Sequence, residues 1–308
     1  MKARALLTSL AEADLRLLRI FIAIAESGGL AAAELRLNIS RSVISRHLKD
    51  LETRLGVRLC ERGRSGFALT EEGATVLDAA RRLFSQIEGF RREVTSLHGD
   101  PRGELNLAVF DKFVTNPACR LAETIAAFGA EAPAVTLNMH VAGTIAIEKG
   151  LLEGDIQAAI HPFHRASESL LYWPLFGEQM WLYGAPEHPL LRDGRLPDEA
   201  ALRTAAFVGL GYHSRNMEHF WRLGLQPAAR AHEQEGSVVL IRSGRYLGFL
   251  PEHYAASFER AGTLRRIPSD TLQYHCEWGV SIARTPPPGR VARHFTALLR
   301  EMHRQPLA

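Results

Sequence analysis

The chain has 308 residues, of which 46% are hydrophobic and 23% are charged. These fractions are those of an ordinary folded protein, so they exclude a disordered chain, and the length predicts two or three folding units. The sequence contains no run of about 18 apolar residues, the length that a membrane-spanning helix needs. The first residues also lack a sustained apolar stretch, so we expect neither a membrane span nor export.

Charge is distributed unevenly along the chain, although the net charge is only +3. Residues 1–103 hold 17 of the 37 basic residues and 13 of the 34 acidic residues, a net charge of +4, which leaves −1 for residues 104–308. Most of the excess lies between Arg36 and Arg64, where eight basic residues face three acidic ones. A local basic patch indicates a module that binds phosphate groups.

Cysteine and histidine usage argues against disulfides and metal sites. The three cysteines are far apart and outside any C-x-x-C pair: Cys60, Cys119 and Cys276. This usage is typical of a reducing compartment, and we expect the cytoplasm. The pairs His161 with His164 and His213 with His219 lack the helical spacing and third ligand of a zinc site. Without a phosphate-binding glycine motif or a G-x-S-x-G motif, we predict no metal, no cofactor and no enzyme.

Three short helices are predicted before Gly56. Apolar residues recur at helical spacing in the first helix: Leu15, Leu18, Ile22 and Ala25. Gly28 and Gly29 end it, a second helix covers residues 30–37, and Ser40 is placed as the N-cap of a third helix that Gly56 ends. Its buried stripe consists of Ile44, Leu48, Leu51 and Leu55. The opposite face of the third helix then carries Ser42, Ser45, Arg46 and Lys49.

A basic hairpin and a long helix follow. Residues 57–62 and 67–70 are predicted strands around a turn at residues 63–66, which is the wing of a winged helix-turn-helix. Thr70 can cap a helix whose apolar positions step by threes and fours over about seven turns. These positions are Leu77, Ala80, Phe84, Ile87, Val94 and Leu97. A long helix with one apolar stripe usually packs against a partner.

Residues 98–103 break this helix and form a candidate linker to a region in which strands alternate with helices. Strands are predicted over 105–109, 135–141 and 155–160, with helices opened by Asn116-Pro117 and by Gly143-Thr144. Similar segments run from residue 180 to about residue 266, and a strand at 280–283 precedes a helix from Arg290 to Met302. This order predicts an open, largely parallel sheet covered by helices.

The third helix carries residue types that can read DNA. Arg46 has the donor fork for a guanine edge in the major groove, and serine and lysine suit bases or phosphates. The alternative is that Arg41, Arg46 and Lys49 merely solvate a surface helix. The basic wing and the uneven charge favour binding of double-stranded DNA.

At this point the chain resembles the LysR-type transcriptional regulators, and the resemblance covers nearly all of it. The motifs that carry it are residues 30–35, 40–48, 51–62 and 69–73, and more loosely 151–156, 186–190 and 243–251. The sequence departs from the family where Arg41-Ser42 replaces a usual Gln-Pro, Cys60 a usual phenylalanine, and Gln157 a frequent aspartate. Base preference therefore cannot be borrowed from the family.

The resemblance implies an α+β winged helix-turn-helix, a long linker helix and an α/β two-lobed effector domain like a periplasmic binding protein. We assign the DNA-binding domain to residues 1–70 and the linker helix to 71–98. The first lobe takes residues 104–180 and 274–308, and the second lobe takes residues 181–273. Contacts to operator DNA are expected from Arg41, Ser42, Ser45, Arg46, Lys49, Arg62 and Arg64.

The resemblance also implies a cleft for a small-molecule effector between the lobes. Its expected wall residues are Asp111, Lys112, Phe113, Thr144, His161, Pro162, Gly209, Tyr212 and His213. Lys112, His161 and the helix starts near Asn116 and Thr144 favour an anionic or polar effector. The alternatives are that Lys112 is a solvated loop lysine and that His161 is a hydrogen-bonded structural histidine.

Subunits are expected to associate through the long helix, with Leu77, Phe84 and Ile87 in a seam between subunits rather than in the core of the DNA-binding domain. The chain is then a homodimer or a homotetramer, with RNA polymerase as a further candidate partner. Two rival functions use the same two-lobed fold: a solute-binding protein and an enzyme. The wing and the lack of a catalytic motif favour a sequence-specific transcriptional regulator that responds to a small molecule, as an activator or as a repressor.

Overall fold

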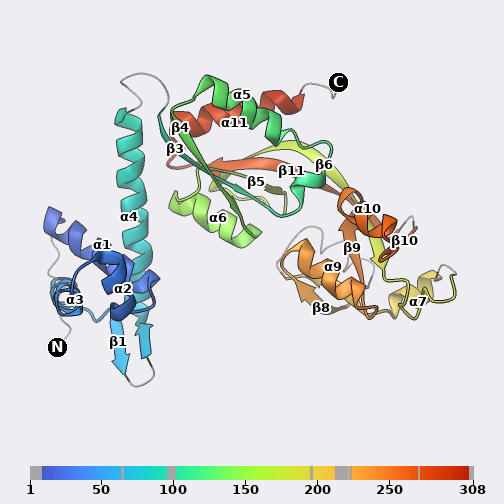
Figure 1. Cartoon of the computed structure of the whole chain (residues 1–308), viewed down its shortest axis with the longest axis horizontal. Coiled ribbons are helices and arrows are strands. Elements are labelled where there is room, and N and C mark those ends of the chain that lie inside the picture. The colour runs from blue at the N-terminus through green and yellow to red at the C-terminus, as the bar shows by residue number, and fades with distance from the viewer. Residues whose placement is uncertain are drawn as a thin grey trace. The chain divides into compact units, whose positions relative to one another are not determined.

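The computed structural model describes residues 9–63, 66–95, 102–194, 197–211, 221, 224–269 and 271–304. The chain forms two compact units, Met1–Phe90 and Arg91–Ala308, which are described separately (Figure 1). Among the described helices, none is both long and apolar enough to cross a membrane.

The N-terminal unit is a three-helix bundle with a hairpin and the start of a long helix. Its elements are α1 (Glu12–Glu26), α2 (Leu30–Leu37), α3 (Arg41–Leu55), β1 (Cys60–Gly63), β2 (Gly66–Leu69) and α4 (Glu71–Thr95). All six were predicted, because glycines and polar caps mark their ends. Gly56 ends α3 in the left-handed conformation, with φ 69°, and the Thr70 hydroxyl accepts a hydrogen bond from the Gly73 amide at 2.9 Å.

Two local predictions in this unit are corrected. Ser40 occupies the N-cap position of α3, but its side chain makes no capping bond and instead lies 3.1 Å from the Ser42 hydroxyl. In α1 the buried residues include Leu17, Phe21 and Ile24 rather than the predicted stripe through Leu15 and Ile22. Ten of the fifteen positions of α1 are apolar and lie on more than one side of the helix, so their spacing alone does not select one face.

The second unit contains a nine-stranded sheet in the order β4-β3-β5-β11-β6-β9-β7-β8, with β10 paired to β6. Its strands are β3 (Gly103–Val109), β4 (Val135–Val141), β5 (Ala158–Pro162), β6 (Leu170–Gly184), β7 (Phe207–Leu210), β8 (Pro227–Ala231), β9 (Leu247–Pro251), β10 (Arg265–Ile267) and β11 (Gln273–Ala283). The sheet is mixed rather than largely parallel. Strands β3, β4 and β5 are parallel to one another, as are β7, β8 and β9, but β5, β11, β6 and β9 pair antiparallel.

The two long strands β6 and β11 explain this mixture. They pair along their length and run from one group of strands to the other (Figure 1). Lobe I is β3, β4 and β5 with their helices, and lobe II is β7 to β10 with theirs. Because the chain crosses between the lobes once in each direction, β6 and β11 must run antiparallel.

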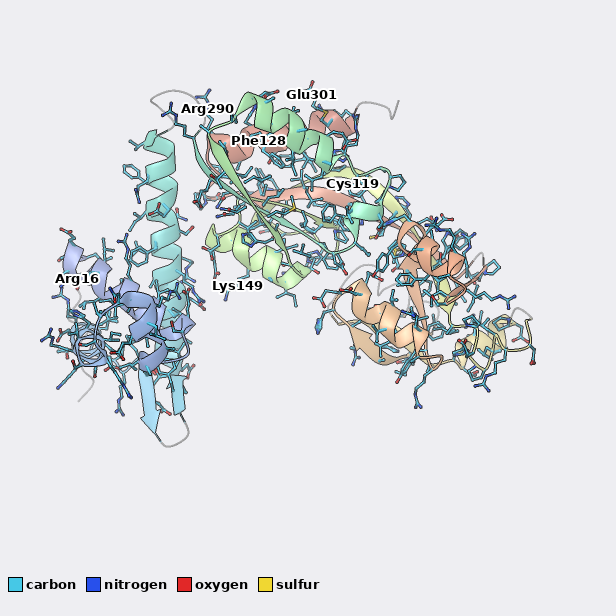
Figure 2. The ribbon with its side chains drawn as sticks, viewed as in Figure 1. Arg16, Cys119, Phe128, Lys149, Arg290 and Glu301 are labelled. Carbon is cyan, nitrogen blue, oxygen red and sulfur yellow. The ribbon has the colours of Figure 1, made fainter. Side chains whose placement is uncertain are left out.

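Helices cover both faces of the sheet in lobe I. They are α5 (Leu121–Glu131), α6 (Thr144–Glu153) and α11 (Arg290–Arg304), and lobe II has α7 (Glu199–Arg203), α9 (Gln234–Arg242) and α10 (Glu252–Arg260). Figure 1 shows α5 and α11 together on one face and α6 on the other. Phe128 of α5, labelled in Figure 2, packs edge-on against Phe295 of α11 with ring centroids 5.2 Å apart.

The helix predicted to start at Asn116-Pro117 begins later, at Leu121, after a 3₁₀ turn over Phe113–Thr115. The Asn116 side chain is responsible. Its Oδ1 accepts a hydrogen bond from the Ala118 amide at 2.9 Å, and its Nδ2 donates to the Gly177 carbonyl at 3.2 Å. Asn116 thus stabilises a turn that joins the loop to β6, and no helix begins at this position.

Candidate functional site

The exposed face of α3 is the first candidate site. Ile44, Leu48 and Leu51 are buried in the core of the N-terminal unit. Helical spacing then places the opposite residues outward: Arg41, Ser42, Arg46 and Lys49 are exposed, and Ser45 is half-buried. The structure brings these five predicted residues together on one helix surface.

The basic residues of this unit fall into two groups: some form ion pairs with acidic side chains, and others do not. Arg36 lies 2.8 Å from a Glu26 carboxylate oxygen, and Arg54 pairs with the buried Asp14. Within the described part of the chain, the side chains of Arg41, Arg46 and Lys49 have no such partner. Arg36 and Arg54 therefore hold the helices together, whereas the cations of the exposed α3 face are available to an external anion.

The wing is attached to α3 by Glu52, which the sequence prediction did not single out. Its Oε1 accepts hydrogen bonds from the Leu59 amide at 2.8 Å and from the Cys60 amide at 3.4 Å. Arg62 lies in β1 opposite Phe67. The Arg62 side chain and Arg64 lie outside the described residues, so their predicted DNA contacts stay predictions.

The second candidate site lies where the starts of α6 in lobe I and α9 in lobe II approach each other. A Cβ added to Gly143, which precedes α6, would come 3.1 Å from a carboxylate oxygen of Glu233, which precedes α9. The Asp111 carboxylate of lobe I accepts a hydrogen bond from the Gln234 amide of lobe II at 2.8 Å. The structure thus forms an interlobe site at Asp111, Thr144 and Gln234.

Three buried polar atoms at this interlobe site have no hydrogen-bond partner among the described residues: Asp111 Oδ1, Thr144 Oγ1 and Gln234 Oε1. Buried polar groups are normally paired, because an unpaired one costs about 1–3 kcal/mol. Burial also raises the pKa of the Asp111 carboxyl. Orphaned polar atoms from both lobes are the arrangement expected where a small polar ligand binds. Gln234 was not predicted from sequence.

Lys112 is neither a solvated loop lysine nor a free cation. Its Nζ lies 3.5 Å from Glu178 Oε1, and the two side chains are 3% and 1% exposed. His253 Nε2 lies 2.9 Å from the other Glu178 oxygen. Burial alone raises the pKa of Glu178, but Lys112 and His253 outweigh burial and lower it. The expectation that the Lys112 charge serves an anionic effector is therefore corrected.

His161 is a structural histidine, as the alternative interpretation held. It is 4% exposed, and burial lowers its pKa to about 4, so the ring is neutral at pH 7. Nδ1 lies 2.9 Å from the Pro162 carbonyl, which can only accept, so Nδ1 carries the proton. Nε2 then accepts from the Ser281 hydroxyl at 2.8 Å. His161 has no positive charge to offer an anion.

The remaining predicted wall residues are dispersed. Phe113 packs against the hydrophobic core of the second unit, and Pro162 is buried at the end of β5. Gly209 is buried in β7 of lobe II. Tyr212 and His213 lie outside the described residues, so the predicted opposite wall stays a prediction. Among the described residues, no group of three or more metal-binding side chains occurs.

The predicted seam on α4 is corrected in part. Leu77 is 7% exposed and belongs to the core of the N-terminal unit. Phe84 is half-buried against that core, and its ring lies 4.9 Å from the Arg19 guanidinium carbon. Ile87 is also half-buried, whereas Phe90 and Val94 are 68% and 40% exposed. The exposed apolar surface of α4 thus begins beyond Phe84.

Two family models match the chain. The model described as bacterial regulatory helix-turn-helix protein, lysR family, matches residues 15–74, and the LysR substrate binding domain matches residues 98–304. The transcriptional activator BauR of Pseudomonas aeruginosa is 40% identical over 263 residues, which cover 85% of this chain and 86% of BauR. The probable regulator LrrA of Synechococcus elongatus is 31% identical and covers 75% of this chain and 78% of LrrA.

Solved structures support the same fold. The crystal structure of CbnR, a LysR family transcriptional regulator, superposes with a TM-score of 0.66 at 24% identity and covers 94% of this chain and 99% of CbnR. CbnR complexed with its target DNA gives a TM-score of 0.65. The family models together span both units, and their order along the chain is that of a helix-turn-helix followed by a two-lobed domain. The chain belongs to the LysR family of DNA-binding transcriptional regulators.

Proposed function

We propose that this regulator contacts operator DNA through the exposed face of α3 and the wing, and that a small polar molecule in the interlobe site changes that binding. The observation that carries the DNA contact is the set of α3 cations without an ion-pair partner in the described chain: Arg41, Arg46 and Lys49. Their neighbours Ser42 and Ser45 add hydroxyl groups that can bond to bases or phosphates. Arg62 and Arg64 of the wing are proposed phosphate contacts.

Base-edge and phosphate contacts have different experimental signatures. A mutation that removes a bond to a base edge lowers affinity for the specific site, whereas one that removes a bond to a phosphate weakens binding to all sequences and reduces its salt dependence. DNA fragments that the wild-type protein selects from a genomic library provide the specific ligand. Footprinting these fragments with wild type and with a Ser42→Ala, Ser45→Ala double variant tests the proposal. An unchanged footprint at unchanged affinity would place the recognition surface elsewhere.

For the effector, we propose a small polar molecule that carries hydrogen-bond donors. Asp111 Oδ1 and Gln234 Oε1 are acceptors, and the Thr144 hydroxyl can donate or accept. The Lys112 charge is already neutralised and His161 is uncharged, so an effector with only a carboxylate lacks a cationic partner in either of them. The first amides of α6 remain a place for an acceptor group of the effector.

Thermal-shift and DNA-binding titrations with alanine, 1,3-propanediol and propionate test this chemistry. The three compounds are similar in size, but only alanine and 1,3-propanediol carry hydrogen-bond donors. We expect compounds with donor groups to stabilise the protein and propionate to have no effect. Asp111→Asn and Thr144→Val should weaken any such response, whereas Lys149→Ala, on the exposed surface of the same helix (Figure 2), should not. A response to propionate equal to that of alanine would contradict the proposed effector chemistry.

We also infer that the chain acts in the cytoplasm as a homodimer or a homotetramer. The exposed apolar residues Phe90 and Val94 on α4 support an association surface on this helix. BauR is named a transcriptional activator, and RNA polymerase is accordingly the partner we propose if this chain activates. Runoff transcription with purified polymerase on selected DNA fragments distinguishes activation from repression.

A further inference from the structure

Lobe I contains a pocket of about 240 Å³ beside α6 that the interlobe site does not use. Aromatic rings form much of its wall: His161, Phe163, His164 and Tyr172. The other residues that line it are Glu148, Arg165, Ala166, Ser167, Leu170 and Ser281. None of the three orphaned atoms of the interlobe site belongs to a residue of this pocket.

Strand register explains why these side chains meet. Tyr172 of β6 lies opposite Ser281 of β11, and His161 of β5 lies opposite Gly279 of β11. Paired residues share a face of the sheet, as do residues two apart on one strand, so His161, Tyr172 and Ser281 all point to the same side. Glu148 reaches the pocket from α6, which packs on β5 and β11.

Gly279 makes room for the tyrosine. A Cβ at this position would come 2.3 Å from Tyr172 Cζ and 2.6 Å from its hydroxyl oxygen, so the ring lies directly over the bare backbone. The Tyr172 hydroxyl is buried and has no hydrogen-bond partner in the described part of the chain. Burial raises the pKa of this phenol, which keeps it protonated and able to donate. The ring of Tyr172, rather than its hydroxyl, is therefore the part that a ligand in the pocket can contact.

The charges around the pocket cancel locally. Arg165 contacts both Glu148 carboxylate oxygens at 2.6 Å, and His164 lies 3.7 Å from the same carboxylate. His161 is neutral, and burial lowers the pKa of His164. A charged ligand here would have to be desolvated without a free counter-charge from these lining residues, which is strongly unfavourable. A neutral ligand does not carry that cost.

We propose that this pocket is a second small-molecule site, for a neutral aromatic compound that packs against the aromatic rings of its wall. Its size is adequate, since an engineered apolar cavity of about 150 Å³ already binds benzene. Aromatic walls favour offset or edge-on packing of a planar ring. His161 and Tyr172 already pack edge-on in this wall, with ring centroids 6.0 Å apart.

Calorimetric titration of the full chain with benzamide, benzoate, benzylamine and toluene tests the proposal. We expect benzamide to bind at least about tenfold more tightly than the two charged compounds, because only they bury an unpaired charge. Tyr172→Leu, which removes an aromatic ring from the wall, should weaken benzamide and toluene alike, by about twofold to tenfold. Benzoate or benzylamine binding as tightly as benzamide would overturn the proposal.

A blocking variant locates the binding. Ala166 is exposed and lines the pocket, so Ala166→Trp should fill its mouth and abolish benzamide binding without disturbing the core. The matched control is Ala126→Trp, at an exposed position of α5 on the opposite face of the sheet. Equal benzamide binding by wild type and both tryptophan variants, or no binding to wild type at millimolar concentrations, would overturn the assignment.

Discussion

In the N-terminal unit, the role of a basic side chain depends on whether it has an ion-pair partner, not on its charge. Arg36 and Arg46 carry the same guanidinium group, yet Arg36 bonds to Glu26 whereas Arg46 is exposed on α3 opposite the buried stripe. Spacing predicted the position of Arg46 because the periodicity of one helix is local information. The partner of Arg36 lies on another helix, so its structural role required the fold.

Arg46→Ala should lower affinity for a selected DNA site while leaving the unit folded. Removing one bidentate bond to a base costs about 1–3 kcal/mol per half-site. Arg36→Ala removes the same charge and is the matched control, with a small effect on specific binding. Fluorescence anisotropy at fixed salt, together with circular dichroism, makes this comparison. Equal losses of affinity for both variants would mean that net charge alone explains the Arg46 effect.

Burial of His161 makes stability depend on pH. The pKa of the folded state is about 4, below the ordinary value of 6.5, so the folded state holds fewer protons than the unfolded state between these values. Stability is therefore lost as pH falls from about 6.5 towards 4, by about 3 kcal/mol from this residue.

His161→Gln should remove this part of the pH dependence. Urea unfolding followed by tryptophan fluorescence measures it in the full chain, because all four tryptophans lie in the second unit. We expect the free energies of unfolding of wild type and variant to converge as pH is lowered from 7 to 4. Parallel pH profiles would show that the folded state tolerates a charged His161.

At the scale of elements, the apolar stripe of α4 shows that a periodic pattern does not reveal which neighbour covers each part of a helix. Its apolar stripe was predicted as one seam, but Leu77 packs into the core of the N-terminal unit and Phe90 is exposed. The environment of the stripe changes along the helix: Leu77 and Ala80 are buried in the N-terminal core and Phe84 contacts Arg19 of α1, whereas the later residues Phe90 and Val94 are exposed. Spacing gives the face of a helix, but it does not say which neighbour covers each turn.

Phe90→Glu combined with Val94→Glu should therefore shift the oligomer towards monomer, whereas changes at Leu77 should unfold the N-terminal unit. Two charges in an apolar seam are strongly unfavourable. Ala74→Glu with Ser85→Glu is the control, since at about 100° per residue these positions lie on the opposite side of α4. Light scattering after gel filtration measures the mass. Unchanged mass in the Phe90 and Val94 variant would remove α4 from the interface.

At the scale of the whole second unit, the contacts that matter join residues far apart in sequence. Asp111 bonds to Gln234 across 123 positions, and Thr115 Oγ1 lies 2.8 Å from His253 Nδ1 across 138 positions. The family resemblance predicted the two lobes and the Asp111 and Thr144 positions. It did not predict Glu178, His253 or Gln234, because no local pattern distinguishes them from other polar residues.

Glu178 is the centre of a buried network that spans the lobes. It lies on β6, pairs with Lys112 after β3 of lobe I, and contacts His253 of α10 in lobe II. The Lys112 ammonium also lies 5.4 Å and 5.6 Å from the ring centroids of Phe110 and Trp278, so few waters can replace a missing partner. Removing the charge of Lys112 or of Glu178 therefore leaves the other charge buried without a partner.

A double-mutant cycle measures how strongly Lys112 and Glu178 depend on each other for the stability of the second unit. Glu178→Gln and Lys112→Met should each destabilise the second unit by about 3–5 kcal/mol, because each leaves one buried charge without its partner. The combined variant should lose much less than the sum, since it removes both charges. Urea unfolding followed by tryptophan fluorescence at pH 7 gives the four free energies. Strictly additive losses would mean that Lys112 and Glu178 are solvated independently, and the lobes would then be joined without any contribution from this ion pair.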